Sequence, residues 1–285
     1  MFSDDFSGSS LDTGRWGTYD ASQQLQRTRF GFSPQLVTEG NINFARIRLD
    51  SYNPQFVGQF KGTEIFTRQR FARGNGLEFS ARLRGPNLPP GIIFAFFGIY
   101  DRFTGTPSDA TYLKDEIDYE FLTAEQEQFS PAGQRKRLYL NLWKDWNVRY
   151  GYDGNDVDDT NIYTDKTYRL ASDPNFDWAN WNTYTVQWFP DRTDFYVNGR
   201  LERTEREVKP AQDMSIHLNI WTGTPDFNQA YSASLQPNRT AATNRSFYFD
   251  VDHVRIRRLG AAMTTQSTPL FETPLPAGTK SYRLR

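Results

Sequence analysis

Hydrophobic residues alternate with polar residues in short runs along most of the chain, and clusters of Gly, Pro, Asn and Asp separate the runs. The runs with this alternation are Asn41–Leu49, Gly76–Arg84, Ile92–Ile99, Asp115–Leu122, Arg137–Trp143, Thr183–Phe189, Asp194–Val197, Met214–Trp221 and Phe247–Ile256. A period of two indicates half-buried β-strands. No long window has the apolar spacing of an amphipathic helix. The pattern predicts an all-β sandwich or barrel.

The residues between the runs suggest how the chain is organised. Asn198-Gly199 predicts a tight hairpin turn, because both residues tolerate the positive φ angles of a type I′ turn. We interpret Tyr150–Asp177, which is crowded with Asp, Asn, Gly and Tyr, as a long surface excursion. We expect a single domain over residues 1–259. The alternation then gives way to Thr, Pro, Ser and Gln, so we expect an extended tail over residues 260–285.

Three of the runs carry an apolar face opposite a face of acids, amides and aromatic rings, since side chains alternate across a strand. The second face consists of Glu116, Asp118 and Glu120, then Tyr139, Asn141 and Trp143, then His217, Asn219 and Trp221. If the three strands adjoin, they form a concave floor with carboxylates in the middle. Rings that stack on sugar faces and polar groups that bind hydroxyls suit a carbohydrate cleft.

Two features of this floor have alternative interpretations. Trp143 and Trp221 would pack in a core if the strands formed the middle layer of a multilayer fold. For His217, a hydrogen-bonded neighbour on the cleft floor is a better interpretation than a catalytic base.

The three acids are close enough to influence one another's protonation. Positions i and i+2 on a strand lie about 6.6 Å apart, so Glu116, Asp118 and Glu120 repel one another and at least one proton is expected to be held at elevated pKa. Glycoside hydrolysis needs one ionised carboxylate and one protonated carboxylic acid. The alternative is a solvated edge strand with chance acids. The Ile, Tyr, Phe and Leu that alternate with the acids indicate a central strand instead.

Composition narrows the possible chemistry. Aromatic residues make up 16% of the 285 residues, which favours sheets and stacking surfaces over helical bundles. The net charge of −1 gives no electrostatic reason to expect a nucleic-acid partner, and no apolar stretch is long enough for membrane insertion by a helix. Cysteine is absent, which excludes thiolate nucleophiles and Cys-bound metals. With His217 and His253 as the only histidines, a three-histidine metal site is excluded.

The segment Asp115–Leu122, with its Glu-x-Asp-x-Glu spacing, resembles the active-site strand of glycoside hydrolase family 16, in the unbulged form of lichenases and xyloglucan endotransglycosylases. Other segments resemble the family in the expected order over about residues 2 to 258. They are Phe6–Trp16, Gly62–Thr67, Ala95–Phe97, Tyr184–Asp191, Phe195–Arg200, Leu218–Trp221 and Val251–Arg255. The resemblance implies a jelly-roll β-sandwich of two antiparallel sheets with an open cleft on the concave sheet.

The resemblance also implies a retaining mechanism. Glu116 would be the nucleophile, Glu120 the general acid/base, and Asp118 the residue between them that tunes their protonation. We expect substrate contacts from Glu64, Phe97, Asn141, Trp143, His217, Asn219 and Trp221. Glu64 rests on the resemblance alone.

Four residues depart from the family pattern. Lys114 stands where lichenases have Trp and the xyloglucan enzymes have His, and Thr123 replaces a common Gly. Phe66 stands where lichenases carry a sugar-contacting Arg, and Tyr139 replaces a Gln. These changes surround the predicted sugar subsites, so the usual substrate does not follow automatically.

Catalysis by carboxylates requires no cofactor, although members of the family often bind one structural Ca²⁺ on the convex side. Asp252 matches the Asp of that site, and Gly40 would supply a backbone carbonyl. One carboxylate with carbonyls and waters is a weak calcium site. An Asp that bonds local backbone is an equally good interpretation of Asp252.

We therefore expect a retaining endo-acting hydrolase of a β-1,3/1,4- or β-1,3-glucan, with a polysaccharide or oligosaccharide as its partner. We expect a monomer that acts outside the cell or in the periplasm, with a signal peptide that is not part of this sequence. The alternatives are a xyloglucan-type transglycosylase, a galactan-active member of the family, and a non-catalytic jelly-roll lectin. The intact acidic trio argues against the lectin, and a polysaccharide lyase would need a more basic floor.

Overall fold

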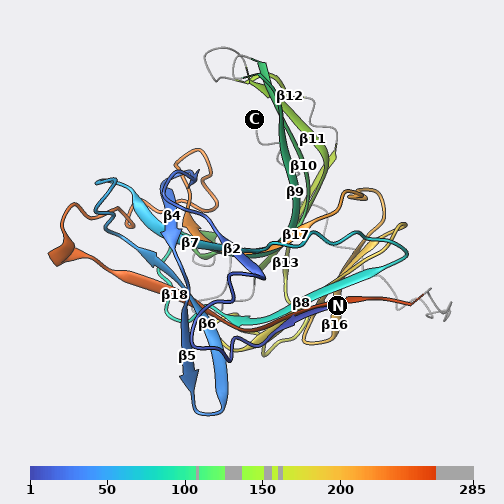
Figure 1. Ribbon diagram of the computed structural model, residues 1–285, viewed down its shortest axis with the longest axis horizontal. Helices are drawn as coiled ribbons and strands as arrows, with labels where there is room; N and C mark the ends of the chain where they lie inside the picture. Colours follow the sequence, from blue (N-terminus) through green and yellow to red (C-terminus); the bar gives the residue numbers. More distant parts are fainter. Residues whose placement is uncertain (107–108, 126–136, 151–155, 160–162, 261–285) are drawn as a thin grey trace.

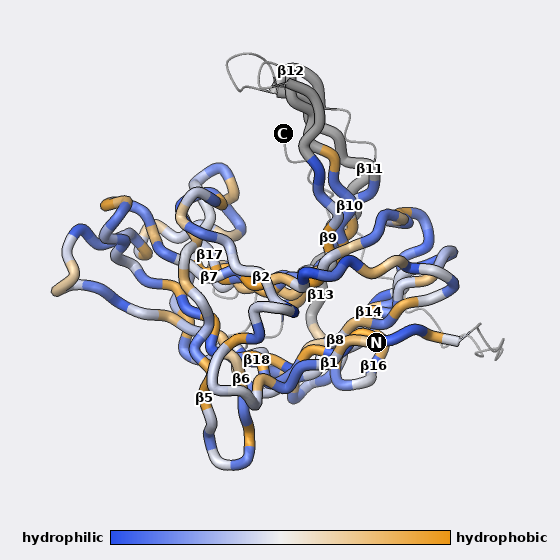
Figure 2. Tube along the Cα trace, in the orientation of Figure 1, coloured by the Kyte–Doolittle hydropathy of each residue, from blue (hydrophilic) through white to orange (hydrophobic). Residues whose placement is uncertain are grey.

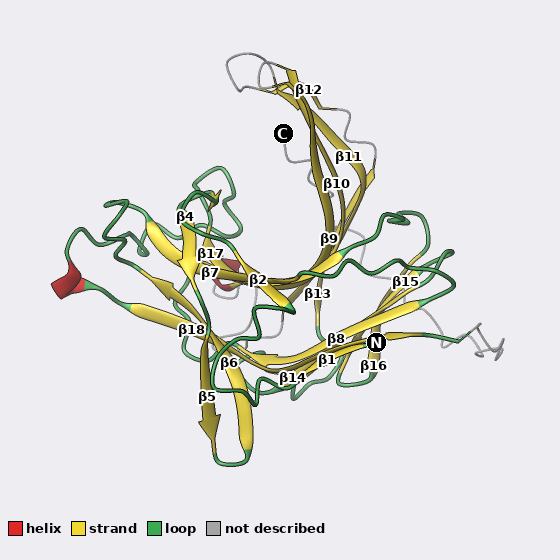
Figure 3. Cartoon of the chain, viewed as in Figure 1, coloured by secondary structure: helices red, strands yellow, loops and turns green. Residues whose placement is uncertain are grey.

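The computed structural model describes residues 1–106, 109–125, 137–150, 156–159 and 163–260. Strands make up nearly all of the regular structure of these residues, with the short 3₁₀ helix η1 (Ala241–Thr243) between the last two strands (Figure 3). The predicted all-β architecture is therefore confirmed. Apart from Gly260, the predicted tail lies outside the described residues.

The strands form two layers. The first layer contains β2 (Trp16–Thr18), β3 (Gln24–Leu25), β4 (Thr28–Phe32), β7 (Phe60–Thr67), β9 (Ile92–Thr106), β10 (Asp109–Leu122), β11 (Arg137–Tyr150), β12 (Asp156–Asp159), β13 (Tyr163–Leu170) and β17 (Ser215–Thr222). Its central order is β7–β17–β9–β10–β11–β13, with each neighbouring pair antiparallel. β2 and β4 pair with β7, and β12 pairs with the far end of β11.

The second layer lies behind the first. It contains β1 (Phe2–Asp4), β5 (Gln35–Glu39), β6 (Ile42–Asp50), β8 (Leu77–Arg84), β14 (Asn182–Trp188), β15 (Thr193–Val197), β16 (Arg200–Glu205) and β18 (Ser246–Arg258). Its order is β5–β6–β18–β8–β14–β15–β16, and β1 pairs with the second half of β18. The pairing of Asp50 with Lys61 connects the two layers.

The first layer is strongly curved. β9, β10 and β11 rise on one side of the molecule and β4 stands on the other, so the layer forms a valley that faces away from the second layer (Figure 1). Buried apolar side chains of both layers, such as Leu218 of β17 and Val254 of β18, form one hydrophobic core cluster, and Figure 2 shows hydrophobic stretches along the strands. Burial of this apolar surface is the main stabilising contribution to the fold.

The core immediately behind the acidic strand is aromatic. Ile117, Tyr119 and Phe121 are fully buried, and Phe121 stacks on Phe94 with a centroid distance of 4.4 Å. The hydroxyl of Tyr119 lies 2.9 Å from the carbonyl oxygen of Tyr196 in the second layer. β10 is thus held from behind by packing and by a hydrogen bond, which fixes the positions of the residues on its other face.

The segments that connect the strands test two predictions made from the sequence. The hairpin at Asn198-Gly199 is confirmed: both residues have positive φ, 50° and 78°, and they join β15 to β16. The interpretation of Tyr150–Asp177 as an excursion is wrong in part, because it contains β12 and β13. β13 pairs with β11 along residues 137–144, and this pairing outweighs the turn-forming composition of the segment.

Candidate active site

The open face of the first layer holds a cleft of about 520 Å³. Its floor comes from β7, β17, β9, β10 and β11, and the segment around β3 supplies part of its wall. The residues predicted on the polar faces of three runs all line it: Glu116, Asp118, Glu120, Tyr139, Asn141, Trp143, His217, Asn219 and Trp221. The predicted contacts Glu64 and Phe97 line it as well. The alternation along the strands therefore predicts the set of side chains that line this cleft.

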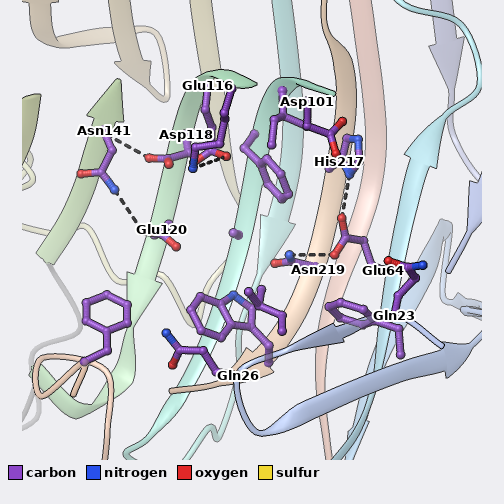
Figure 4. Close-up of a pocket in the computed structure, with 18 of the residues that line it drawn as sticks. Gln23, Gln26, Glu64, Asp101, Glu116, Asp118, Glu120, Asn141, His217 and Asn219 are labelled. Carbon is purple, nitrogen blue, oxygen red and sulfur yellow. Dashed lines mark hydrogen bonds and ion pairs between the residues drawn. The ribbon is translucent and has the colours of Figure 1, made fainter. Parts of the chain in front are cut away.

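The three strands with polar faces do not all adjoin. β10 and β11 adjoin, whereas β9 lies between β10 and β17. β9 presents Ala95, Phe97 and Ile99 to the cleft, so an apolar strip separates the acids of β10 from the polar residues of β17. Figure 4 shows the acids on one side of this strip and Glu64, His217 and Asn219 on the other.

Asn141 forms hydrogen bonds to two of the three acids, Asp118 and Glu120. Its backbone N–H donates to Asp118 Oδ1 at 3.0 Å, and its side-chain amide donates to Glu120 Oε2 at 3.0 Å (Figure 4). A hydrogen bond from an amide to a carboxylate is stronger than one between neutral groups. Asn141 therefore holds Asp118 and Glu120 in a fixed arrangement from the neighbouring strand.

Asp118 is the most perturbed member of the trio. Burial raises the pKa of Asp118 well above its usual value, and the charges of Glu120 and Glu116 and a hydrogen bond with Glu116 raise it further. The ammonium group of Lys114 opposes this rise in the pKa. The expected elevated pKa thus falls on the central acid, which is protonated more readily than an exposed Asp.

Glu116 has a cationic neighbour. Lys114 Nζ lies 3.0 Å from Glu116 Oε2, and both side chains are 12% exposed. The same Nζ lies 4.2 Å from the centre of the Trp143 ring, which is close enough for a cation–π interaction. The sequence marked Lys114 as a departure from the family but gave no sign of this contact, which joins two strands.

Glu64 lies in a second buried polar network. His217 Nδ1 is 2.7 Å from Glu64 Oε1, and the side-chain amide of Asn219 donates to Glu64 Oε2 at 3.1 Å (Figure 4). The other ring nitrogen of His217 is 2.8 Å from Ser215 Oγ. Both nitrogens of His217 are therefore used within the protein, which favours the interpretation of this residue as a hydrogen-bonded neighbour.

The aromatic residues of the cleft differ in their environment. Trp221 is 5% exposed and packs in a small cluster with Ile93, Leu122 and Tyr139, while Phe227 stacks on it at 6.2 Å. Trp143 is half-buried, and Lys114 occupies one of its faces. Trp221 thus combines a place in the cleft with core-like packing, so both interpretations of this residue are partly correct.

Several lining residues were not found from the sequence. They are Tyr19, Gln23, Gln24, Leu25, Gln26, Phe30, Asp101, Thr224, Asp226 and Phe227. Many of them lie in short strands and connections that carry no clear alternation. The run Gln23-Gln24-Leu25-Gln26 is a signal that could have been used, because amide side chains suit sugar hydroxyls.

The departures from the family pattern have structural explanations. Phe66 stacks on His217 at 5.2 Å and fills the space beside Gly17, where a Cβ would come within 2.4 Å of its ring. The hydroxyl of Thr123 lies 2.8 Å from the backbone nitrogen of Ile92 and 2.7 Å from the carbonyl oxygen of Pro89. Tyr139 is buried against Trp221 and also lines the cleft.

The residues suggested for calcium make other contacts in the structure. Asp252 Oδ2 lies 2.6 Å from Arg82 Nη1 and 3.2 Å from His253 Nδ1, so an ion pair with Arg82 and a contact with the His253 ring already occupy the carboxylate. Gly40 lies in the turn between β5 and β6, with a φ of 60°. Among the described residues there is also no group of three or more His, Asp or Glu side chains that could hold a metal ion. The geometry gives the calcium prediction no support.

Comparison with known proteins identifies the family. A sequence profile for Glycosyl hydrolases family 16 matches residues 26–240, which is well over half of the chain and includes the acidic trio. The chain belongs to glycosyl hydrolase family 16. The resemblance found in the sequence is thereby confirmed. No helix in the described part of this family 16 chain has the length and apolar character needed to cross a membrane.

Individual relatives of this family 16 chain are distant in sequence. It is 26% identical to a beta-glucanase of Bacillus subtilis over 226 residues, which cover 78% of this chain and 75% of that protein. A beta-glucanase of Bacillus amyloliquefaciens is 25% identical over 218 residues, which cover 75% of this chain and 74% of that protein.

Solved structures of the family share the architecture. The beta-glucanase of Bacillus licheniformis superposes with a TM-score of 0.61 at 19% identity, over 90% of this chain and 98% of that one. A family 16 endo-glucanase of Bacteroides ovatus gives a TM-score of 0.61 at 15% identity, over 90% of this chain and 99% of that one. These matches confirm the predicted jelly-roll sandwich.

Proposed function

We propose that this family 16 enzyme is a retaining endo-β-glucanase that cleaves a β-1,3/1,4- or β-1,3-glucan. The observation that carries the proposal is the row of Glu116, Asp118 and Glu120 on one face of β10, on the floor of an open cleft. The beta-glucanases and laminarinase among its relatives support the substrate class. The cleft crosses the strands from β11 to β3, as suits an enzyme that cuts within a polymer.

In the first step, Glu116 attacks the anomeric carbon and the glycosidic bond breaks. Glu120 gives its proton to the departing sugar oxygen, so that a covalent glycosyl-enzyme forms. The attacking group is thus one end of the trio, and the proton comes from the other end.

In the second step, Glu120 takes a proton from a water molecule. The water oxygen bonds to the anomeric carbon, and the bond to Glu116 breaks to restore its carboxylate. Two displacements at one carbon return the original β configuration. Asp118 lies between the two residues and holds a proton readily, so it tunes their protonation without contacting the anomeric carbon.

The remaining polar residues of the floor would bind sugar hydroxyls. Glu64 and Asn219 form one hydrogen-bonded unit on the far side of the β9 strip from the acids. Phe97 provides an apolar surface between the two groups, and Trp143 and Trp221 border the cleft. Polar groups on both sides of an apolar strip suit a ribbon of pyranose rings. An extracellular or periplasmic location and a monomeric state remain predictions.

The proposal is tested with a panel of barley mixed-linkage glucan, laminarin, carboxymethyl cellulose, xyloglucan and agarose. Linkage analysis of the products identifies the bond cleaved, and proton NMR at early times gives the anomeric configuration of the new reducing end. We expect internal cleavage of one of the first two polymers and a β-anomer as the first product. Cleavage of agarose alone, or an α-anomer as the first product, would show the proposal to be wrong.

A further inference from the structure

Lys114 is the only Lys or Arg among the described residues that line the cleft, and it faces a set of carboxylates. The acidic residues that line the same cleft are Glu64, Asp101, Glu116, Asp118, Glu120 and Asp226. Lys114 Nζ lies 3.0 Å from Glu116 Oε2. Because both side chains are only 12% exposed, water screens this ion pair less than it would screen a surface pair.

The pairing of β10 with β11 is irregular beside Lys114. Glu116 is opposite Trp143, whereas Lys114, two residues earlier, is opposite Trp146. Two steps on β10 therefore face three steps on β11, which is a bulge in β11. Trp143 lies beneath Lys114 Nζ at 4.2 Å, so its ring supports the ammonium group beside Glu116.

We propose that Lys114 is a positioning residue that acts through Glu116 in the second step of the reaction, where it stabilises the departing carboxylate. The inference rests on the proposed role of Glu116 as the nucleophile. In the second step, the bond between Glu116 and the anomeric carbon breaks and the electron pair returns to the carboxylate. The Lys114 ammonium group stabilises the negative charge that returns to Glu116. The ion pair between the two side chains is weak while Glu116 is esterified, and it forms again when the ester bond breaks.

The same interaction has the opposite effect in the first step. The carboxylate loses charge as it bonds to the anomeric carbon, so the ion pair stabilises the starting state more than the transition state. Removal of the ammonium group should therefore slow the second step and leave the first step unchanged or faster. A residue that only supported the local structure would slow both steps.

The two steps are separated with 2,4-dinitrophenyl β-cellobioside and 2,4-dinitrophenyl β-laminaribioside. Their leaving group departs without a proton from Glu120, so kcat/KM reports the first step and kcat reports the second. For Lys114→Met we expect kcat to fall about tenfold, the typical effect of losing one charged hydrogen bond. KM should fall in parallel, so that kcat/KM stays within about twofold of the wild-type value.

A slower second step has two direct signatures. In Lys114→Met the burst of dinitrophenolate should stay stoichiometric with enzyme while the steady phase that follows it becomes slower than in the wild type, and mass spectrometry of acid-quenched protein should show that the added disaccharide persists longer than in the wild type. Lys114→Arg, which keeps the charge, should restore most of kcat. The matched control is Lys61→Met, because Lys61 Nζ also lies over an aromatic ring, that of Phe32 at 4.5 Å, but lines a different pocket. This control should leave both kinetic constants unchanged.

Each result supports or overturns the inference. Equal losses of kcat and kcat/KM in Lys114→Met, or kinetics identical to the wild type, would overturn it. If Lys114→Met does not fold, Lys114→Gln provides the same neutral replacement, with melting curves recorded for each variant. A Glu116→Gln variant that still turned over either aryl glycoside would instead overturn the proposed function. A dead Glu116→Gln enzyme beside unaltered Lys114→Met kinetics would overturn the inference alone.

Discussion

The side-chain amide of Asn141 on β11 donates a 3.0 Å hydrogen bond to Glu120 Oε2 on β10. The proposed acid/base is therefore held by the neighbouring strand. The backbone N–H of the same Asn141 donates to Asp118 Oδ1, so one residue positions two members of the trio. The spacing between the acids then depends on the pairing of these two strands.

Replacement of Asn141 should distinguish the effect of its side-chain hydrogen bond to Glu120 from that of its backbone hydrogen bond to Asp118. Asn141→Ala removes the amide from Glu120 but keeps the backbone donor to Asp118, so we expect a folded enzyme with kcat/KM lowered about tenfold to a hundredfold. Asn141→Asp has nearly the same size but places a repelling carboxylate beside Glu120, and its loss should be larger. Initial rates on barley glucan and laminarin measure both effects. Full activity in Asn141→Ala would argue against this role.

The raised pKa of Asp118 predicts a pH-dependent stability. Asp118 binds its proton more tightly in the folded protein than in the unfolded chain, where the pKa of an Asp is about 3.9. Its contribution to the free energy of unfolding is therefore present below about pH 4 and is lost as the pH rises towards the raised pKa. Asp118→Asn cannot ionise, and its amide oxygen can still accept the bond from Asn141.

We accordingly expect Asp118→Asn to melt at a higher temperature than the wild type at pH 8, and the difference to shrink as the pH is lowered to 4. Melting curves across this range measure it, with Asp213→Asn, at an exposed position that does not line the cleft, as a control. A variant less stable than the wild type at pH 8 would contradict the assignment of the raised pKa to Asp118.

Trp221 should contribute to stability as well as to binding. Its ring is 5% exposed and contacts the cluster of Ile93, Leu122 and Tyr139, so Trp221→Ala leaves a cavity. We expect the free energy of unfolding to fall by about 3 kcal/mol. Trp143→Ala, at a half-buried position, should cost less. Urea unfolding measures both values, and an unchanged midpoint for Trp221→Ala would mean that its packing contributes little.

Replacement of Thr123 should lower the stability of the protein without changing its catalytic activity. Its buried hydroxyl lies within hydrogen-bonding distance of the backbone nitrogen of Ile92 and the carbonyl oxygen of Pro89. Thr123→Val leaves these groups unsatisfied, which should cost about 1–3 kcal/mol of unfolding free energy. Thr123→Ser keeps the hydroxyl and should be close to the wild type. A fall in kcat/KM in Thr123→Val without a fall in stability would instead indicate a direct role at the subsites.

The sequence was sufficient to predict which side chains share a face. Side chains alternate along any strand, so the runs containing Glu116, Asn141 and Asn219 each separate cleft residues from core residues before any pairing is known. The same reasoning correctly placed Tyr119 and Phe121 behind the acids. These predictions depend on local periodicity alone.

Contacts between strands could not be predicted in this way. The bond between His217 and Glu64 joins residues 153 positions apart, and it exists because β17 pairs with β7 in one register. The placement of β9 between β10 and β17 has the same origin. The contact of Lys114 with Trp143 lies beside a bulge in β11, which the residue pattern does not reveal.

The central claim is that Glu116 is the nucleophile and Glu120 the acid/base, and chemical rescue tests it most directly. Azide is added to Glu120→Ala and to Glu116→Ala with an activated aryl glycoside as substrate, and NMR gives the configuration of the glycosyl azide. We predict the β-azide from Glu120→Ala, because azide displaces Glu116 from the covalent intermediate. We predict the α-azide from Glu116→Ala, because azide replaces the nucleophile in a single displacement. The reverse pairing of variants and products would contradict the account.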